Sequence, residues 1–136
     1  MHYLGIDYGT KRIGLALATD ETQPVPFRTL GIRNYELGIK EVIDVIRDEH
    51  IDVIVVGRPK HLSADGELSE MERAIDQFIA HLASCISLPI IVEDERLTSK
   101  AADQLMREYQ TSGDRDSLAA MLILESYLSR KSKLSI

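Results

Sequence analysis

The sequence predicts an α/β fold in which helices flank a mixed five-stranded sheet. Three apolar runs within residues 2–32, separated by short polar turns, favour an antiparallel meander. Two further runs, 51–56 and 89–92, are short, almost entirely apolar and rich in β-branched residues, as buried parallel strands are. Each of these two runs follows a segment whose apolar residues recur at helical spacing. Strands that alternate with helices in this way indicate an α/β domain.

The meander is expected to contain strands at about residues 2–7, 12–18 and 26–32. A polar turn at 19–24 separates the second strand from the third. Pro26 weakens the third strand, because proline cannot donate to a β-ladder, so this strand is expected at an edge of the sheet.

Helices are expected where apolar residues recur every three or four positions. Asn34 is a suitable N-cap for the first helix, and Thr98 for the third. The four expected helices cover about residues 35–49, 68–82, 99–109 and 116–129. The polar sequence 111–115 separates the last two helices.

Right-handed crossovers place the strand at 51–56 beside the first strand and in parallel with it. The strand at 89–92 then lies outside it, and the carboxyl ends of these three parallel strands share one edge of the sheet. Asp7, Gly57 and residues 93–95 follow those carboxyl ends, where ligands bind in open α/β sheets. This edge is therefore the expected functional site.

Composition indicates an ordinary globular domain, expected to span residues 1–136. The chain is 44% hydrophobic and 28% charged, and no apolar run approaches the roughly 20 residues that span a bilayer. The single cysteine, Cys85, excludes an internal disulfide and is expected to be a small core residue. A cytoplasmic location follows as an expectation, since no signal-peptide pattern precedes the first strand. The net charge of -6 argues against coating nucleic acid by charge alone.

Three acidic positions are the candidates for chemistry. Asp7 ends a buried strand, one of residues 93–95 follows another, and Asp116 begins the last helix, where Ala119 and Ala120 would let that helix approach the sheet. Carboxylates gathered at one edge repel unless a cation neutralises them, and Mg²⁺ or Mn²⁺ fits an all-oxygen site. Two such ions could hydrolyse a phosphodiester. Simpler interpretations are that Asp7 caps a turn and that Asp116 complements the helix dipole.

Four cations near this edge are candidates for binding phosphate. Lys11 and Arg12 follow Asp7 in a turn whose backbone amides at Gly9 and Thr10 could also bind an anion. The other two candidates, Arg58 and Arg96, follow the fourth and fifth strands. For Arg96, an ion pair with a neighbouring acid is the alternative role.

Four ordered motifs closely resemble the YqgF family and cover nearly the whole chain. They are IDYGTKRIGLA at 6–16, VGRP at 56–59, DERLT at 94–98, and DSLAA at 116–120 followed by Leu124 and the Tyr-Leu pair at 127–128. The family resembles Holliday-junction resolvases of the RuvC type and has the RNase H-like fold. The resemblance implies a cytoplasmic nuclease that matures the 5′ end of pre-16S ribosomal RNA, with Asp7, Glu95 and Asp116 as its acidic triad and divalent metal ligands.

Several alternatives remain open from sequence. The substrate could be structured RNA, within a pre-ribosomal particle, or branched DNA. The chain could also be a non-catalytic ribosome-assembly factor on a nuclease fold. A strand–Asp–x–Gly–Thr turn also occurs in actin-like and sugar-kinase domains, although those enclose a nucleotide between two domains and this chain supplies one. Arg58 stands where the family usually has a small apolar residue, and the loop that follows it is expected to bind substrate differently.

Overall fold

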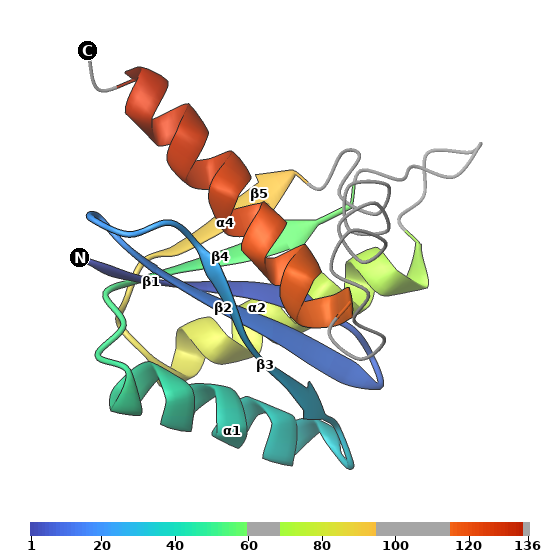
Figure 1. The fold of residues 1–136 in the computed structure, drawn as a ribbon. Coiled ribbons are helices and arrows are strands. Elements are labelled where there is room, and N and C mark those ends of the chain that lie inside the picture. The colour runs from blue at the N-terminus through green and yellow to red at the C-terminus, as the bar shows by residue number, and fades with distance from the viewer. Residues whose placement is uncertain (60–68, 95–114, 135–136) are drawn as a thin grey trace.

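The computed structural model describes residues 1–59, 69–94 and 115–134 of the chain, and these form one mixed sheet with three helices (Figure 1). The helix expected at 99–109 lies outside the described residues. The described elements are β1 (His2–Tyr8), β2 (Arg12–Thr19), β3 (Val25–Gly31), α1 (Tyr35–Asp48), β4 (Val53–Arg58), α2 (Glu70–Cys85), β5 (Ile90–Asp94) and α4 (Arg115–Leu134).

The sheet has the strand order β3-β2-β1-β4-β5. β1 is antiparallel to β2 and parallel to β4, and β4 is parallel to β5, which confirms the predicted topology. β3 is an edge strand, as its proline predicts. The prediction that the fifth strand is buried is wrong: β5 is the opposite edge, and Val92 is 46% exposed. An edge strand has a neighbouring strand on one side only, so its apolar residues keep more contact with solvent.

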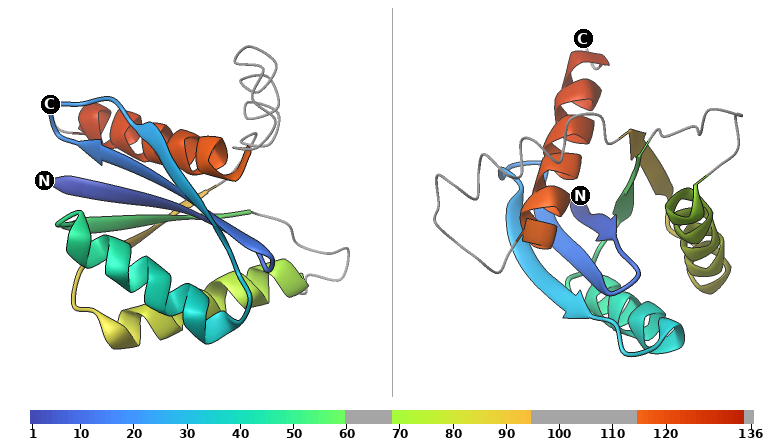
Figure 2. Two further views of the ribbon diagram at one scale, coloured as in Figure 1. Left: turned by 60° about the horizontal axis from the view of Figure 1, so that its bottom comes forward. Right: turned by 90° about the vertical axis from the view of Figure 1, so that its right-hand side faces the viewer.

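Helices cover both faces of the sheet (Figure 2). α1 and α2 lie against one face and α4 lies against the other. Strand alternation decides which side chains meet which helices. In β1, Leu4 and Ile6 point into the core beneath α1 and α2, whereas Tyr3 packs with residues of α4.

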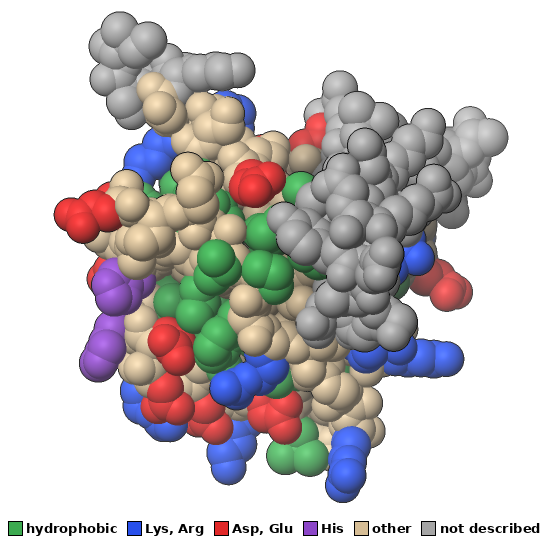
Figure 3. Space-filling model, in the orientation of Figure 1, with side chains coloured by type: hydrophobic (Ala, Val, Ile, Leu, Met, Phe, Trp, Pro, Cys, Tyr) green, Lys and Arg blue, Asp and Glu red, His purple; other side chains and the backbone are tan. Residues whose placement is uncertain are grey.

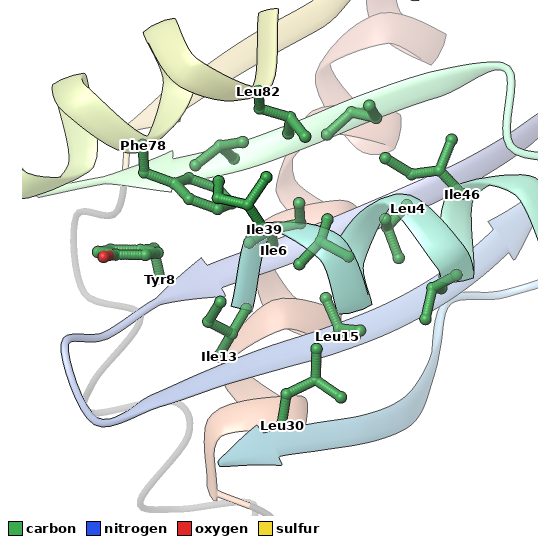
Figure 4. Close-up of a cluster of buried hydrophobic side chains, with 14 of the residues drawn as sticks. Leu4, Ile6, Tyr8, Ile13, Leu15, Leu30, Ile39, Ile46, Phe78 and Leu82 are labelled. Atoms are coloured by element: carbon green, nitrogen blue, oxygen red, sulfur yellow. The ribbon is translucent and has the colours of Figure 1, made fainter. Parts of the chain in front are cut away.

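The larger core lies between the sheet and the α1–α2 layer (Figure 4). Tyr8 stacks on Phe78 of α2 with their ring centroids 4.4 Å apart. Ile39 and Val42 of α1 and Leu82 of α2 are almost completely buried there. This layer therefore fixes the end of β1, the strand that carries Asp7.

On the other face, two glycines let α4 lie directly on the sheet. A Cβ atom at Gly5 would lie 2.7 Å from the backbone oxygen of Ala120, and one at Gly14 would lie 2.0 Å from the backbone oxygen of Asp116. The buried Ala120 confirms that a small helix residue serves the close approach. The glycines provide the sheet side of the same contact.

The helix ends show local sequence control. The Asn34 side chain accepts a hydrogen bond from the Leu37 amide at 2.8 Å, which confirms it as the N-cap of α1. Ser69 and Glu72 form a reciprocal capping box at the start of α2. Cys85, the last residue of α2, is exposed, so its assignment to the core is wrong. Cys85 is exposed because α2 ends there, at the surface of the protein. None of the helices in the described ranges combines the length and apolar character needed to cross a membrane.

Arg58, at the end of β4, ties the sheet to α2. Its Nε and a terminal guanidinium nitrogen donate to the two carboxylate oxygens of Asp76 at 2.9 and 3.1 Å. Another guanidinium nitrogen lies 3.4 Å from Glu72, whose side chain is only 1% exposed. The hydrogen bond from Arg58 lowers the pKa of Asp76, and the same bond raises the pKa of Arg58.

We predict that Gly14→Ala destabilises the protein, because its methyl group would overlap the backbone of Asp116 and not a flexible side chain. Forced repacking of this kind costs about 1–3 kcal/mol. Gly31→Ala is the matched control, since a Cβ there meets nothing within 4 Å, and its effect should stay within about 0.5 kcal/mol. Urea unfolding of both variants measures the difference, and equal stability would contradict the close approach of α4.

We also predict that Arg58→Ala lowers the free energy of unfolding by about 3 kcal/mol at pH 7, because it leaves the buried Glu72 without its cation. Exposed Arg47, paired with Asp44 and Asp48, is the control, and Arg47→Ala should cost less than about 1 kcal/mol. The pKa of Asp76 is lower in the folded protein than in the unfolded chain. The contribution of Asp76 to the free energy of unfolding is therefore complete at pH values above the unfolded-state pKa, and it disappears as the pH falls through the folded-state pKa. The difference in free energy of unfolding between wild type and Arg58→Ala should therefore become smaller below about pH 4. A difference that does not change with pH would exclude the Arg58–Asp76 interaction.

Candidate active site

Asp7 lies at the carboxyl end of β1, on the face of the sheet that α4 covers. Its strand neighbours on that face are Gly5, which contacts Leu124 and Ala120 of α4, and Tyr3, which packs in the core beneath that helix. Asp7 is half-buried. The strand therefore holds the carboxylate in a fixed direction at the boundary between core and solvent.

Asp116 reaches the same place from the opposite end of the sequence. Its backbone rests on Gly14, and Gly14 is the direct antiparallel partner of Asp7 in the register of β1 and β2. The Asp116 side chain is 25% exposed. The two predicted acids thus flank a single glycine, one from the strand beside it and one from the helix above it.

Arg12, expected to bind phosphate, is held by one of these acids. Its Nε donates to Oδ2 of Asp116 at 2.8 Å, and its side chain remains 62% exposed. Lys11, beside it in the hairpin turn, is also exposed. The Gly9 amide donates to the Arg12 carbonyl at 2.9 Å within the turn, so the expectation that this amide is open to an anion is wrong.

The acids of β5 separate by strand alternation. Glu93 is buried and bonds with Ser126 and Arg130 of α4, which places it on the face that also carries Asp7. Asp94, the next residue along the strand, lies on the alternate face. Glu95 and Arg96 lie outside the described residues. Of the acids at 93–95, Glu93 is thus the one whose carboxylate is held by α4.

Arg58 is not brought to the acids. It points to the face of the sheet that α2 covers, where Asp76 and Glu72 bind it. Its proposed phosphate contact stays a prediction, and the structure gives the side chain a different set of partners.

A cation that the sequence interpretation missed lies beside the hairpin. The Ile32 amide donates to the Lys11 carbonyl at 2.9 Å, which joins the β1–β2 turn to the segment that follows β3. Arg33 is the next residue and is exposed. Lys and Arg side chains project at the lower right of the space-filling view, where these two turns lie in Figure 1 (Figure 3). Lys11, Arg12 and Arg33 are called here the hairpin cations. No local pattern marks Arg33, because its place depends on the pairing of β2 with β3.

The donors in this site fit a divalent cation. Asp7 and Asp116 supply carboxylate oxygens, the ligands that Mg²⁺ and Mn²⁺ prefer. Both carboxylates come from elements that are packed against each other, and Asp116 pairs with the exposed Arg12. Within residues 1–59, 69–94 and 115–134, no three His, Cys, Asp or Glu side chains group closely enough to hold a metal ion. The described residues therefore supply two of the three predicted ligands.

Sequence comparison gives relatives that match almost end to end. A protein of Maridesulfovibrio salexigens, named "Putative pre-16S rRNA nuclease", is 36% identical over 136 residues, which cover 96% of this chain and 99% of that protein. A Geobacillus protein with the same name is 33% identical over 139 residues, again covering 96% of this chain and 99% of the relative.

Structural comparison gives the same fold. The RuvC protein of Thermus thermophilus in complex with a Holliday junction substrate matches with a TM-score of 0.66 at 14% identity, covering 97% of both chains. The fowlpox virus Holliday junction resolvase matches with a TM-score of 0.58 at 15% identity, covering 98% of this chain and 99% of that one. A ROK family protein from Streptococcus pneumoniae, in complex with sucrose, has a TM-score of 0.51 at 14% identity, and the match covers 79% of this chain and only 39% of that one.

These matches confirm the RNase H-like fold expected from the motifs. The family model described as "RuvX: Holliday junction resolvase" matches residues 1–130. This span contains every described strand and most of α4. The chain therefore belongs to the RuvX family of resolvase-like nucleases.

Proposed function

We propose that this protein is a metal-dependent endonuclease of the cytoplasm that hydrolyses phosphodiester bonds, with Asp7, Glu95 and Asp116 as its acidic residues. The observation that carries the proposal is the convergence of Asp7 and Asp116 on Gly14 in a chain of this family. Glu95 lies outside the described residues and is included because it stands in the sequence DERLT at 94–98, which resembles the family's motif.

In this proposal the three carboxylates would hold Mg²⁺ or Mn²⁺, with two ions as the expected number. Bound ions of this kind activate a water molecule and stabilise the leaving oxygen of a phosphodiester. The protein's own part is positioning. The two packed layers of the fold fix Asp7 and Asp116, while Lys11 and Arg12, with Arg96, bind backbone phosphates and orient the scissile bond.

The proposed substrate is the 5′ end of pre-16S ribosomal RNA, free or within a pre-ribosomal particle. It is supported by the names of relatives that share about a third of their residues with this chain over nearly its whole length. The structural neighbours support branched DNA as the second candidate, because one of them is bound to a Holliday junction. Incubation with a pre-16S RNA fragment and with a four-way DNA junction, each with Mg²⁺, Mn²⁺ or chelator, distinguishes the two substrates.

The same incubation tests the non-enzymatic and kinase-like alternatives. Metal-dependent binding of RNA without cleavage would favour an assembly factor. A kinase-like domain would be stabilised by nucleotide and would cleave neither substrate. The ROK-family chain is more than twice as long as the segment matched to this chain.

We predict that Asp116→Asn lowers the cleavage rate by orders of magnitude while the melting temperature changes little. Asparagine retains the side-chain shape at a helix N-terminus, and the lost charge costs only about 0.3–1 kcal/mol there. Cleavage should recover in part at higher Mn²⁺ concentration, because the variant loses a charged metal ligand.

Rates of wild type and Asp116→Asn across a metal titration, alongside thermal melts, provide the measurement. Glu125→Gln on the same helix is the control for a change of one charge. Near-normal cleavage by Asp116→Asn at low Mg²⁺ would return Asp116 to the role of a helix-dipole partner.

We further predict that Arg33→Ala weakens RNA binding through a phosphate contact beside Lys11. The magnitude of the slope of log affinity against log salt concentration should fall by about 0.7 for single-stranded RNA. Arg47→Ala removes the same charge from the last turn of α1, where Arg47 already pairs with Asp44 and Asp48, and should leave the slope unchanged. Fluorescence anisotropy at four salt concentrations measures both slopes. Identical slopes for the two variants would remove Arg33 from the binding surface.

A further inference from the structure

The ion pair between Arg12 and Asp116 joins two groups that the proposed reaction uses separately. Their side chains meet at 2.8 Å although the residues are 104 positions apart in sequence. One is a proposed phosphate contact and the other a proposed metal ligand. The pairing therefore raises the question of what happens to Arg12 when a cation binds Asp116.

The two uses of Asp116 compete. The Arg12 Nε–H occupies Oδ2 of the carboxylate, and its guanidinium places a permanent positive charge beside it. A divalent cation at the same carboxylate would be repelled by that charge. It would also compete with the Arg12 hydrogen bond for Oδ2 of Asp116. Binding a metal ion with full strength therefore requires Arg12 to leave.

Only one member of the pair is able to move. The Asp116 backbone is packed against Gly14, with no room for even a methyl group between them. Arg12 has a long side chain that is 62% exposed, and it lies next to Lys11 in the hairpin turn. When the Arg12 side chain leaves the carboxylate, it extends into solvent near Lys11, where a phosphate would be an alternative partner.

We propose that Arg12 is a positioning residue that couples the two binding events: a nucleic-acid phosphate draws Arg12 away from Asp116 and so raises the affinity of Asp116 for the divalent cation. The inference rests on the proposed nuclease function. Because binding linkage is reciprocal, the cation also raises the affinity for nucleic acid by the same factor. Arg12 thereby neutralises the Asp116 carboxylate until both substrate and cation are bound.

The test measures Mn²⁺ affinity, not cleavage. Mn²⁺ is titrated calorimetrically into the full-length protein, alone and saturated with a 2′-O-methyl RNA oligonucleotide, at constant ionic strength and with the RNA-only titration subtracted. In wild type, RNA should raise the Mn²⁺ affinity about fivefold or more, the usual range of allosteric coupling. In Arg12→Ala, Mn²⁺ should bind more tightly without RNA, and RNA should add little. Arg12→Lys should restore part of the coupling, because lysine carries the charge without the guanidinium geometry.

A control separates this mechanism from general electrostatics. Arg47→Ala changes the net charge equally, and Arg47 lies in the last turn of α1, where it pairs with Asp44 and Asp48. This variant should retain the RNA-induced gain in Mn²⁺ affinity. A gain that persists in Arg12→Ala, or that is absent from wild type, would overturn the coupling.

Asp116→Asn distinguishes failure of the coupling from failure of the site. If this change weakens Mn²⁺ binding while the Arg12 variants behave as wild type, the proposed metal ligand stands and only the coupling is wrong. If Asp116→Asn leaves the Mn²⁺ affinity unchanged, both the ligand and the coupling are rejected. Since Arg12 is largely exposed, its variants should keep the wild-type melting temperature within a few degrees.

Discussion

The contact of α4 with the glycines of β1 and β2 is the constraint on which the rest of this site depends. Gly14 receives the backbone of Asp116, and its register partner is Asp7, so one close approach sets the separation of two acids. Bonds from α4 to Glu93 of β5 hold the same helix farther along its length. Lys131 of α4 also donates to the Tyr3 hydroxyl at 2.7 Å. A helix fixed at several points keeps Asp116 in place without relying on a flexible loop.

The cations of this acidic chain divide according to the face of the sheet on which they lie. Arg58 neutralises Glu72 and Asp76 on the α2 face, and Arg130 neutralises the buried Glu93 on the α4 face. These ion pairs connect the sheet to the helices that cover it. Arg12 pairs instead with Asp116, and Lys11 precedes it in the same exposed turn. A polyanion would thus meet positive charge in this turn, although the net charge of the chain is -6.

Predictions from sequence succeeded where the signal is local and failed where exposure or pairing depends on distant segments. The Asn34 cap and the meander were predictable because a few neighbouring residues decide them. The apolar composition of β5 suggested burial, yet its place at the sheet edge leaves Val92 exposed. Cys85 is apolar enough for a core but ends its helix in solvent. The direction of the Arg58 side chain, towards α2, is set by strand parity, and its phosphate contact stays a prediction.

The sequence by itself determined the Asn34 cap and the place of Asp7 at the carboxyl end of a buried strand, because periodicity and turn chemistry act over a few residues. It also determined the order of the strands, because crossovers between parallel strands are almost always right-handed. The tertiary structure alone decided that Asp116 rests on Gly14, that Arg12 pairs with this acid, and that Ile32, the residue before Arg33, bonds to Lys11. Each of these contacts joins residues far apart in the chain. Their geometry depends on how closely a helix packs on a sheet and on the register of strand pairing, and neither quantity is encoded in the spacing of the residues that it brings together.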